Sequence, residues 1–239
     1  MSRRTLGFVL LFLLVSGVLV AHCAHYWPFL SDDALISLRY ARRLNEGLGL
    51  TWTGNERVEG YTDLLWVLLT ALPGRLGLDL IWTARVLDFI GALLAILMVS
   101  LSPESLQPSR TRLLTGGLAL ALSAPVAVWA IGGLEHGFML GVLAAALLFL
   151  NRALQDDKPA TRNWLLVGLL LAILSLLRAD GPVLALGVGL GVILSGSISG
   201  FRQTARRVGL LAALPCCFVA AQLVFRLLYY GEWIPNSAL

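Results

Sequence analysis

Long apolar runs alternate with short polar stretches along most of the chain. Seven of these runs approach the roughly 20 residues that a helix needs to cross a bilayer. They cover approximately residues 6–26, 81–101, 113–131, 134–150, 164–177, 182–198 and 208–230. The pattern therefore predicts an all-α membrane protein, with about seven transmembrane helices in a single transmembrane domain over residues 1–239.

Residues 28–80 interrupt this pattern and form the longest loop between predicted spans. The stretch "LISLRYARRLNEG" is amphipathic, which is typical of a helix lying at a membrane surface. The stretch "TDLLWVLLTALPGRLG" is apolar but short, and Pro73 and Gly74 interrupt it. We expect it to form an interfacial or re-entrant helix.

Composition supports a membrane protein. Only 13% of the 239 residues are charged and 58% are hydrophobic, whereas an ordinary soluble domain has about 25% charged residues. The net charge of +4 is divided among loops and forms no single basic patch, so nucleic acid is not an expected partner. Cys23, Cys216 and Cys217 lie in or beside apolar runs and are predicted to be small membrane-buried residues, because an odd number does not suggest a disulfide set.

The distribution of basic residues predicts the orientation. If the N-terminus is cytoplasmic and the first helix is uncleaved, the inner loops hold Arg3, Arg4, Arg110, Arg112, Arg152, Lys158, Arg162, Arg202, Arg206 and Arg207. This satisfies the positive-inside rule. The loop 28–80 then faces the periplasm of a bacterial inner membrane.

Two further patterns concern the helices themselves. Gly187, Gly189 and Gly191 favour close packing of the helix over 182–198 against a neighbour. Asp88 follows Arg85 by three residues, a spacing that predicts an ion pair on one helix face.

Ionisable residues gather at the predicted outer ends of the helices. Those singled out as candidate site residues are Asp32, Asp33, Arg39, Arg43, Glu59, Tyr61, Glu135, His136, Arg178 and Asp180. Ionisable groups near a bilayer boundary often mark a site.

These candidates also have structural interpretations. Asp32 and Asp33 fit the first turn of a helix that follows Ser31, where acids favour the helix dipole. Arg39 and Arg43 suit lipid headgroups, and the Glu135–His136 and Arg178–Asp180 pairs suit tight turns.

The chemistry that uses this set is group transfer from a polyprenyl-phosphate sugar. A carboxylate would act as general base on an acceptor hydroxyl, and arginines would bind the phosphate, which their fork of donors fits. Asp32 and Asp33 would point about 100° apart on a helix, so we expect them to have different roles. Which of them is the base is left open. An adjacent Asp pair alone is a weak signal for a divalent metal site, so a metal cofactor is left open.

The sequence resembles bacterial GT-C-fold integral membrane glycosyltransferases, in their terminal arabinofuranosyltransferase-like branch. The resemblance rests on "SDDALISLRYARRLNEGLGLTWTGNERVEGYTDLLW", and downstream on "GLEHGFMLGVLAAALL", "LLRADGPVLALG" and "FRLLYYGEWIPNS". It departs from the family at Asp63-Leu64, where Ser-Pro is frequent, at His136, where Thr is common, and at Ala179, where Pro is common.

The resemblance implies an enzyme that transfers a sugar from a polyprenyl-phosphate donor to a glycan, lipid or protein acceptor outside the cytoplasm, with membrane lipids as further partners. It implies that Asp32 or Asp33 is the catalytic base. Glu59, Tyr61, Glu135, His136, Arg178 and Asp180 would line the site, with Arg39 and Arg43 near the donor. Family members are longer, so a C-terminal truncation is expected. A non-catalytic truncated paralogue and a lipid-linked sugar transporter or flippase remain alternatives.

Overall fold

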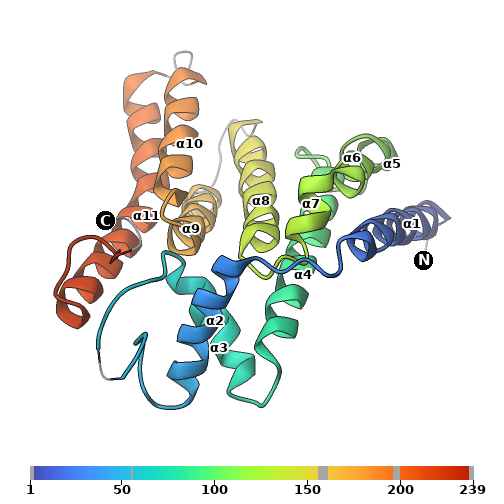
Figure 1. The fold of residues 1–239 in the computed structure, drawn as a ribbon. Helices are drawn as coiled ribbons and strands as arrows, with labels where there is room; N and C mark the ends of the chain where they lie inside the picture. The colour runs from blue at the N-terminus through green and yellow to red at the C-terminus, as the bar shows by residue number, and fades with distance from the viewer. Residues whose placement is uncertain (1–2, 55, 156–160, 196–199, 237–239) are drawn as a thin grey trace. The chain divides into compact units, whose positions relative to one another are not determined.

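The computed structural model describes residues 3–54, 56–155, 161–195 and 200–236. Apart from an isolated bridge between Leu101 and Pro108, the regular elements in these ranges are helical (Figure 1). They are α1 (Arg3–His25), α2 (Asp32–Asn45), α3 (Leu64–Gly74), α4 (Leu80–Ser100), α5 (Arg110–Arg112), the π-helix η1 (Leu113–Gly117), α6 (Leu118–Leu122), α7 (Ala124–Trp129), α8 (His136–Gln155), α9 (Thr161–Leu177), α10 (Gly181–Ser195) and α11 (Phe201–Tyr229). The predicted all-α class is confirmed.

Four of the described helices are long and apolar enough to cross a membrane, namely α1, α4, α8 and α11. Helices α9 and α10 are apolar but shorter, with 17 and 15 residues. The count of seven spans therefore stays a prediction. Lys158 and residues 196–198, which end one predicted span, lie outside the described residues.

The span predicted over 113–131 is wrong as a continuous helix. Helices α5, η1 and α6 follow one another without a break, but the backbone at Ser123 is extended (φ −75°, ψ 119°) and α7 begins anew at Ala124. Pro125 stands in the first turn of α7. Proline has no N–H to donate and fits best in the first turn of a helix, which favours a new helix start at this point, so the apolar run folds as two helices.

The chain divides into two compact units, each described here by itself. The first unit comprises Met1–Ala34 and Ile81–Asp157, and the second comprises Leu35–Leu80 and Lys158–Leu239. The predicted single-domain organisation stays a prediction.

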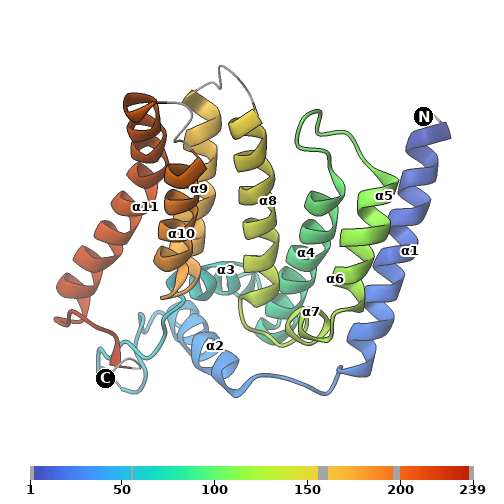
Figure 2. The same cartoon turned by 90° about the horizontal axis from the view of Figure 1, so that it is seen from above.

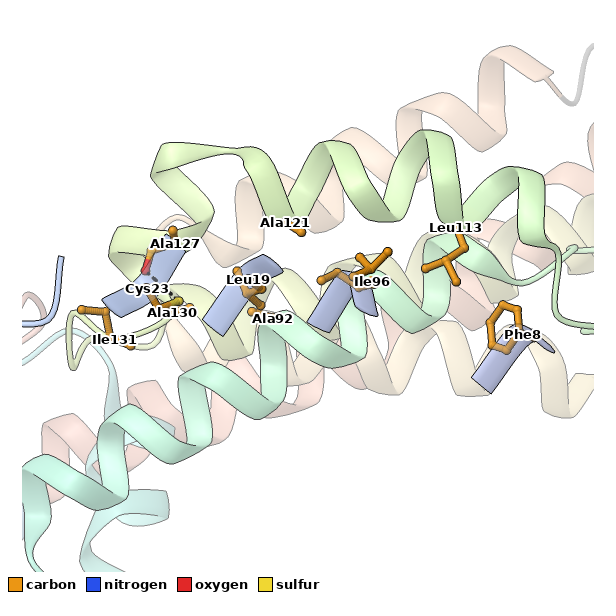
Figure 3. Close-up of a cluster of buried hydrophobic side chains, with 11 residues drawn as sticks. Phe8, Leu19, Cys23, Ala92, Ile96, Leu113, Ala121, Ala127, Ala130 and Ile131 are labelled. Atoms are coloured by element: carbon orange, nitrogen blue, oxygen red, sulfur yellow. Dashed lines mark hydrogen bonds between the residues drawn. The ribbon is translucent and has the colours of Figure 1, made fainter. Parts of the chain in front are cut away.

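In the first unit, α1 packs against α6 and α7 (Figure 2). Figure 3 shows buried side chains of the core of this unit, which include Phe8 and Leu19 of α1, Ala92 and Ile96 of α4 and Leu113 of η1. The thiol of Cys23 is buried here and donates to the carbonyl of Ala127 at 3.4 Å. Cys216 and Cys217 lie instead on an exposed part of α11.

Glycine allows α4 and α8 to approach closely. A Cβ added to Gly91 would lie 2.2 Å from the Cα of Phe138, and one added to Gly141 would lie 2.5 Å from the Gly91 carbonyl. Small residues bring helix backbones together in this way in membranes. The packing role predicted for Gly187, Gly189 and Gly191 is wrong, because a Cβ on any of them meets no described atom within 4 Å.

In the second unit, α9 packs against α10 and α11 (Figure 2), and also against α3. Helix α2 is amphipathic as predicted. It buries Leu38, Tyr40 and Ala41 and exposes Arg39 and Arg42. Its buried face joins Leu50, Tyr61 and α3 in a core against which Phe225, Tyr229 and Tyr230 pack.

Candidate functional site

Asp32 and Asp33 occupy the first turn of α2, and both side chains are exposed. This confirms the helix start predicted after Ser31. Acids at this position are stabilised by the partial positive charge of the helix N-terminus. One carboxylate oxygen of Asp32 accepts the backbone N–H of Asp33 at 3.1 Å. The second Asp32 oxygen and the Asp33 carboxylate remain accessible to a bound molecule.

The start of α2 is fixed to the turn between α7 and α8. The backbone N–H of Ser31 donates to the Gly132 carbonyl at 3.0 Å, and the ring of Phe29 meets Trp129 edge-on at 5.7 Å. Gly133 has a φ of +87°, and a Cβ there would lie 2.8 Å from Leu30. A small residue at this point lets the two segments touch. The structure thus brings the aspartate pair beside the turn that carries Glu135 and His136.

Glu135 and His136 contribute differently to this turn. Glu135 is buried, with 2% of its surface exposed, and its carbonyl accepts the Met139 N–H in the first turn of α8. The imidazole of His136 stacks on the indole of Trp129, with ring centroids 4.3 Å apart. The aromatic pair fixes the orientation of the imidazole. A role of His136 in binding substrate stays a prediction.

Asp88 has a partner that the sequence pattern did not predict. Its carboxylate accepts the backbone N–H of Phe138 at 3.1 Å, which caps the first turn of α8 from α4. Arg85 instead donates to the carbonyls of Trp27 and Phe29 at 3.2 and 2.9 Å. The predicted Arg85–Asp88 pair is therefore wrong. Backbone groups from other segments outcompete the local partner.

In the second unit, Glu59 is buried against α11. Its carboxylate receives the Nε and Nη2 of Arg226 at 2.5 and 3.2 Å, and its carbonyl accepts the N–H of Asn236 at 2.9 Å. In the sequence, Arg226 stands near the end of the apolar run over residues 208–230. Nothing in the local pattern links it to a residue so far away in the chain.

Tyr61 lies in the same cluster and is 2% exposed. Its hydroxyl shares a hydrogen bond of 3.0 Å with that of Tyr230, which in turn donates to the Leu50 carbonyl. Burial raises the pKa of both phenols above the ordinary value, and the neighbouring Tyr230 adds to the effect at Tyr61. Both hydroxyls therefore stay neutral and serve as hydrogen-bonding groups in the core.

Arg39 and Arg43 hold the loop that follows α2. The Nε of Arg39 donates to the Trp52 carbonyl at 2.9 Å and its guanidinium lies 4.5 Å from the Trp52 ring centroid. Arg43 donates to the hydroxyl of Thr51 and the carbonyl of Gly54. A guanidinium has five N–H donors, so each arginine keeps donors for an anion while it orders the loop.

The "EGLGL" and "YTD" stretches have physical explanations. Gly49 has a φ of +72°, and a Cβ there would lie 2.5 Å from the hydroxyl of Tyr229, which accepts the N–H of Leu50 at 3.1 Å. Asp63, which departs from the family pattern, is buried and accepts the hydroxyl of Ser37 at 2.6 and 2.8 Å. That contact ties the start of α3 to α2.

Arg178 and Asp180 form an ion pair of 2.9 Å in the turn between α9 and α10, with side chains 31% and 57% exposed. This agrees with the structural interpretation of the pair. Among the ranges that the structure describes, no group of three or more His, Cys, Asp or Glu is arranged to hold a metal ion.

Comparison of the sequence with known proteins finds two similar glycosyltransferases. The chain is 30% identical over 241 residues to the terminal β-(1→2)-arabinofuranosyltransferase of Mycobacterium tuberculosis, covering 97% of this chain and 38% of that protein. It is 27% identical over 248 residues to the protein of the same description from Corynebacterium glutamicum, covering 95% of this chain and 35% of that one. The chain is similar to terminal arabinofuranosyltransferases. The resemblance predicted from its motifs is confirmed, and the chain spans somewhat more than a third of the length of these relatives.

No protein-family model matches the chain, and no solved structure matches it.

Proposed function

We propose that this chain provides the acid-bearing part of a membrane glycosyltransferase of the GT-C type. The enzyme transfers a sugar from a polyprenyl-phosphate donor to an acceptor hydroxyl on the periplasmic face of the bacterial inner membrane, with the N-terminus cytoplasmic. The observation that carries the proposal is the pair of exposed carboxylates at the start of α2, in a chain that is similar to named sugar transferases over nearly its whole length.

The reaction is a single displacement at the anomeric carbon. A carboxylate of the aspartate pair removes the proton of the acceptor hydroxyl as its oxygen bonds to that carbon. The bond from the anomeric carbon to the phosphate oxygen breaks, and its electron pair leaves with the polyprenyl phosphate. The proton then passes from the carboxyl group to water. Because the reaction has only one displacement, the configuration at the anomeric carbon is inverted.

Helix α2 supports a division of roles along one face. Arg39 and Arg43 follow Asp32 by seven and eleven residues, which are close to whole numbers of helical turns. Asp32, Arg39 and Arg43 therefore share a face of α2, whereas Asp33 lies about 100° around the helix. The remaining N–H groups of the two arginines would stabilise charge on the departing phosphate, and Asp32 on the same face would serve as the base.

A reconstitution assay tests the proposal. The purified chain in proteoliposomes receives a labelled polyprenyl-phosphate arabinofuranose, with other polyprenyl-phosphate sugars as comparison donors, and an oligosaccharide acceptor. We expect transfer by the unmodified chain and its loss in the Asp32→Asn/Asp33→Asn double variant. Glu46→Gln, which changes an exposed acid just after α2, is the control and should transfer normally. Transfer by the double variant at the unmodified rate would overturn the role of the aspartates.

A further inference from the structure

Asp88 is a buried acid in a helix that is long and apolar enough to cross a membrane. It lies in the first half of α4 and is fully buried. Its second carboxylate oxygen, Oδ2, has no hydrogen-bond partner among the described residues. Placing an acid inside such a helix is energetically unfavourable, and acids that occur there usually serve a function. The contacts of Asp88 indicate what that function is.

The carboxylate of Asp88 holds the beginning of α8. Its Oδ1 accepts the backbone N–H of Phe138 at 3.1 Å, which is one of the first N–H groups of α8 and has no acceptor within its own helix. The two backbones meet at the same place, because a Cβ added to Gly137 would lie 2.5 Å from the Asp88 carbonyl oxygen. Helices α4 and α8 lie side by side (Figures 1 and 2), and Asp88 fixes the point at which α8 begins.

The same contact places the two candidate site residues at the start of α8. Glu135 and His136 directly precede Gly137, and the Glu135 carbonyl accepts the N–H of Met139 at 2.8 Å. Glu135 also lies close enough to Asp88 for the two carboxyl groups to interact electrostatically. A shift in the start of α8 would therefore move both candidate residues.

The turn before α8 in turn supports the start of α2. The carbonyl of Gly132 accepts the N–H of Ser31 at 3.0 Å, and a Cβ added to Gly133 would lie 3.3 Å from the Cβ of Ala34. The aspartate pair lies between Ser31 and Ala34. Every residue in this path belongs to the first unit, so a continuous set of contacts leads from Asp88 to the aspartate pair.

Helix α4 also holds the segment that precedes α2. Arg85, three residues before Asp88, donates to the carbonyls of Trp27 and Phe29 at 3.2 and 2.9 Å. The aspartate pair is thus supported from α4 by two routes. The route through Arg85 ends before Ser31, whereas the route through Asp88 includes the turn that touches Ser31 itself.

We propose that Asp88 is a positioning residue of the candidate site, whose carboxylate fixes the start of α8 and, through the turn before α8, orients Asp32 and Asp33. The contact is to a backbone N–H, so the hydrogen-bond acceptor matters more than the charge. The effect of Asp88 on sugar transfer rests on the proposed function. Its effect on the backbone around Ser31 does not.

Two measurements on the purified full chain test this role. Hydrogen–deuterium exchange followed by mass spectrometry reports on the backbone over residues 29–36 and 130–139, and steady-state sugar transfer in proteoliposomes reports on the reaction. Asp88→Leu removes the acceptor at similar size, and Asp88→Asn keeps it. Gly141→Ala is the matched control, because it loosens the contact between α4 and α8 but leaves the Asp88 carboxylate in place. Asp88→Ala replaces Asp88→Leu if the latter does not fold.

We expect amide exchange in both segments to be at least about fivefold faster in Asp88→Leu, as when a helix loses its cap. The kcat for sugar transfer should fall about 10²-fold, which is the effect of displacing a reacting group by about 1 Å, and should change more than the donor KM. Asp88→Asn should restore both the slow exchange and the rate. Gly141→Ala should lower the unfolding midpoint but leave kcat and the exchange over residues 29–36 unchanged.

Unchanged exchange over residues 29–36 in Asp88→Leu would overturn the proposal, because the contacts of Arg85 would then hold the aspartate pair without Asp88. The proposal would also be wrong if Asp88→Asn exchanged as fast as Asp88→Leu, or if Gly141→Ala lowered kcat as much. If the unmodified chain transfers no sugar, the proposed function fails, and the exchange measurement alone decides the role of Asp88.

Discussion

The carboxylate of Glu59 receives two donors of the Arg226 guanidinium, Nε at 2.5 Å and Nη2 at 3.2 Å. The third nitrogen of the guanidinium, Nη1, donates to the Trp233 carbonyl at 3.3 Å. Only 4% of the Glu59 side chain and 15% of the Arg226 side chain are exposed. One ion pair thus joins the loop after α2, the end of α11 and the segment that follows it.

Glu59→Gln should destabilise the second unit strongly, because it leaves a mostly buried guanidinium without its carboxylate. Losing one partner of a buried pair costs about 3–5 kcal/mol, and we expect a loss near the lower value. The free energy of unfolding in mixed detergent micelles measures it. The matched control is Asp180→Asn, which breaks the exposed pair with Arg178 and should cost no more than about 1 kcal/mol.

Exchanging the two charges separates pairing from other effects. The Glu59→Arg/Arg226→Glu double variant should recover part of the stability that either single change loses. If the Glu59 and Asp180 variants lose equal stability, the buried pair does not hold this loop.

The sequence could predict the elements that local composition determines. Helices α1, α4, α8 and α11 begin and end within a few residues of the predicted spans, apart from the longer start of α11 and end of α8, because a continuous apolar run carries the signal. The break at Ser123 was missed, because hydropathy averaged over the run hides one proline. The aspartate pair was correctly placed at a helix start, since capping chemistry is also local.

Partners that lie far apart in the chain could not be predicted. Glu59 and Arg226 are 167 positions apart, and no spacing rule connects them. Asp88 had a plausible partner three residues away in Arg85, yet it accepts the Phe138 N–H, 50 positions away. The glycines show the same limit. Periodicity identified Gly187, Gly189 and Gly191 as packing residues, but only the folded chain shows which helix face has a neighbour.

Gly141→Ala should therefore disturb the contact between α4 and α8. Its new Cβ would lie 2.5 Å from the carbonyl of Gly91, a backbone atom that cannot swing aside. Overpacking of this kind costs about 1–3 kcal/mol, which a shift of the thermal unfolding midpoint in detergent would report. Gly187→Ala is the control. It should be neutral or stabilising, since alanine favours a helix over glycine by up to about 1 kcal/mol. Equal midpoints for the two variants would contradict the close approach.

The neutral phenols of Tyr61 and Tyr230 predict a stability that depends on alkaline pH. Burial raises the pKa of both groups in the folded chain, whereas in the unfolded chain a tyrosine ionises near pH 10. Their contribution is fully present below about pH 10 and falls as the pH rises above it, because only the unfolded chain then releases the protons. Unfolding measured across this range should show the fall, and Tyr61→Phe should reduce its slope. If Tyr61→Phe left the slope of stability against pH unchanged, the pKa of Tyr61 would not be raised in the folded chain.

The two aspartates at the start of α2 should differ in their effect on sugar transfer. Asp32 shares a helix face with Arg39 and Arg43, and its carboxylate is oriented by the N–H of Asp33 at 3.1 Å. Removing a general base lowers turnover by about 10²–10⁴-fold, so Asp32→Asn should lower kcat by this factor with little change in the donor KM. Asp33→Asn, on another face, should act mainly on KM.

Steady-state rates over a range of donor concentrations separate the two effects. Asn preserves the size of the side chain, and both side chains are exposed, so each variant should lower the unfolding midpoint only slightly, through the lost attraction between the charge and the helix N-terminus. A larger loss of kcat in Asp33→Asn would reassign the base to Asp33. It would also place the donor on the side of α2 away from Arg39 and Arg43.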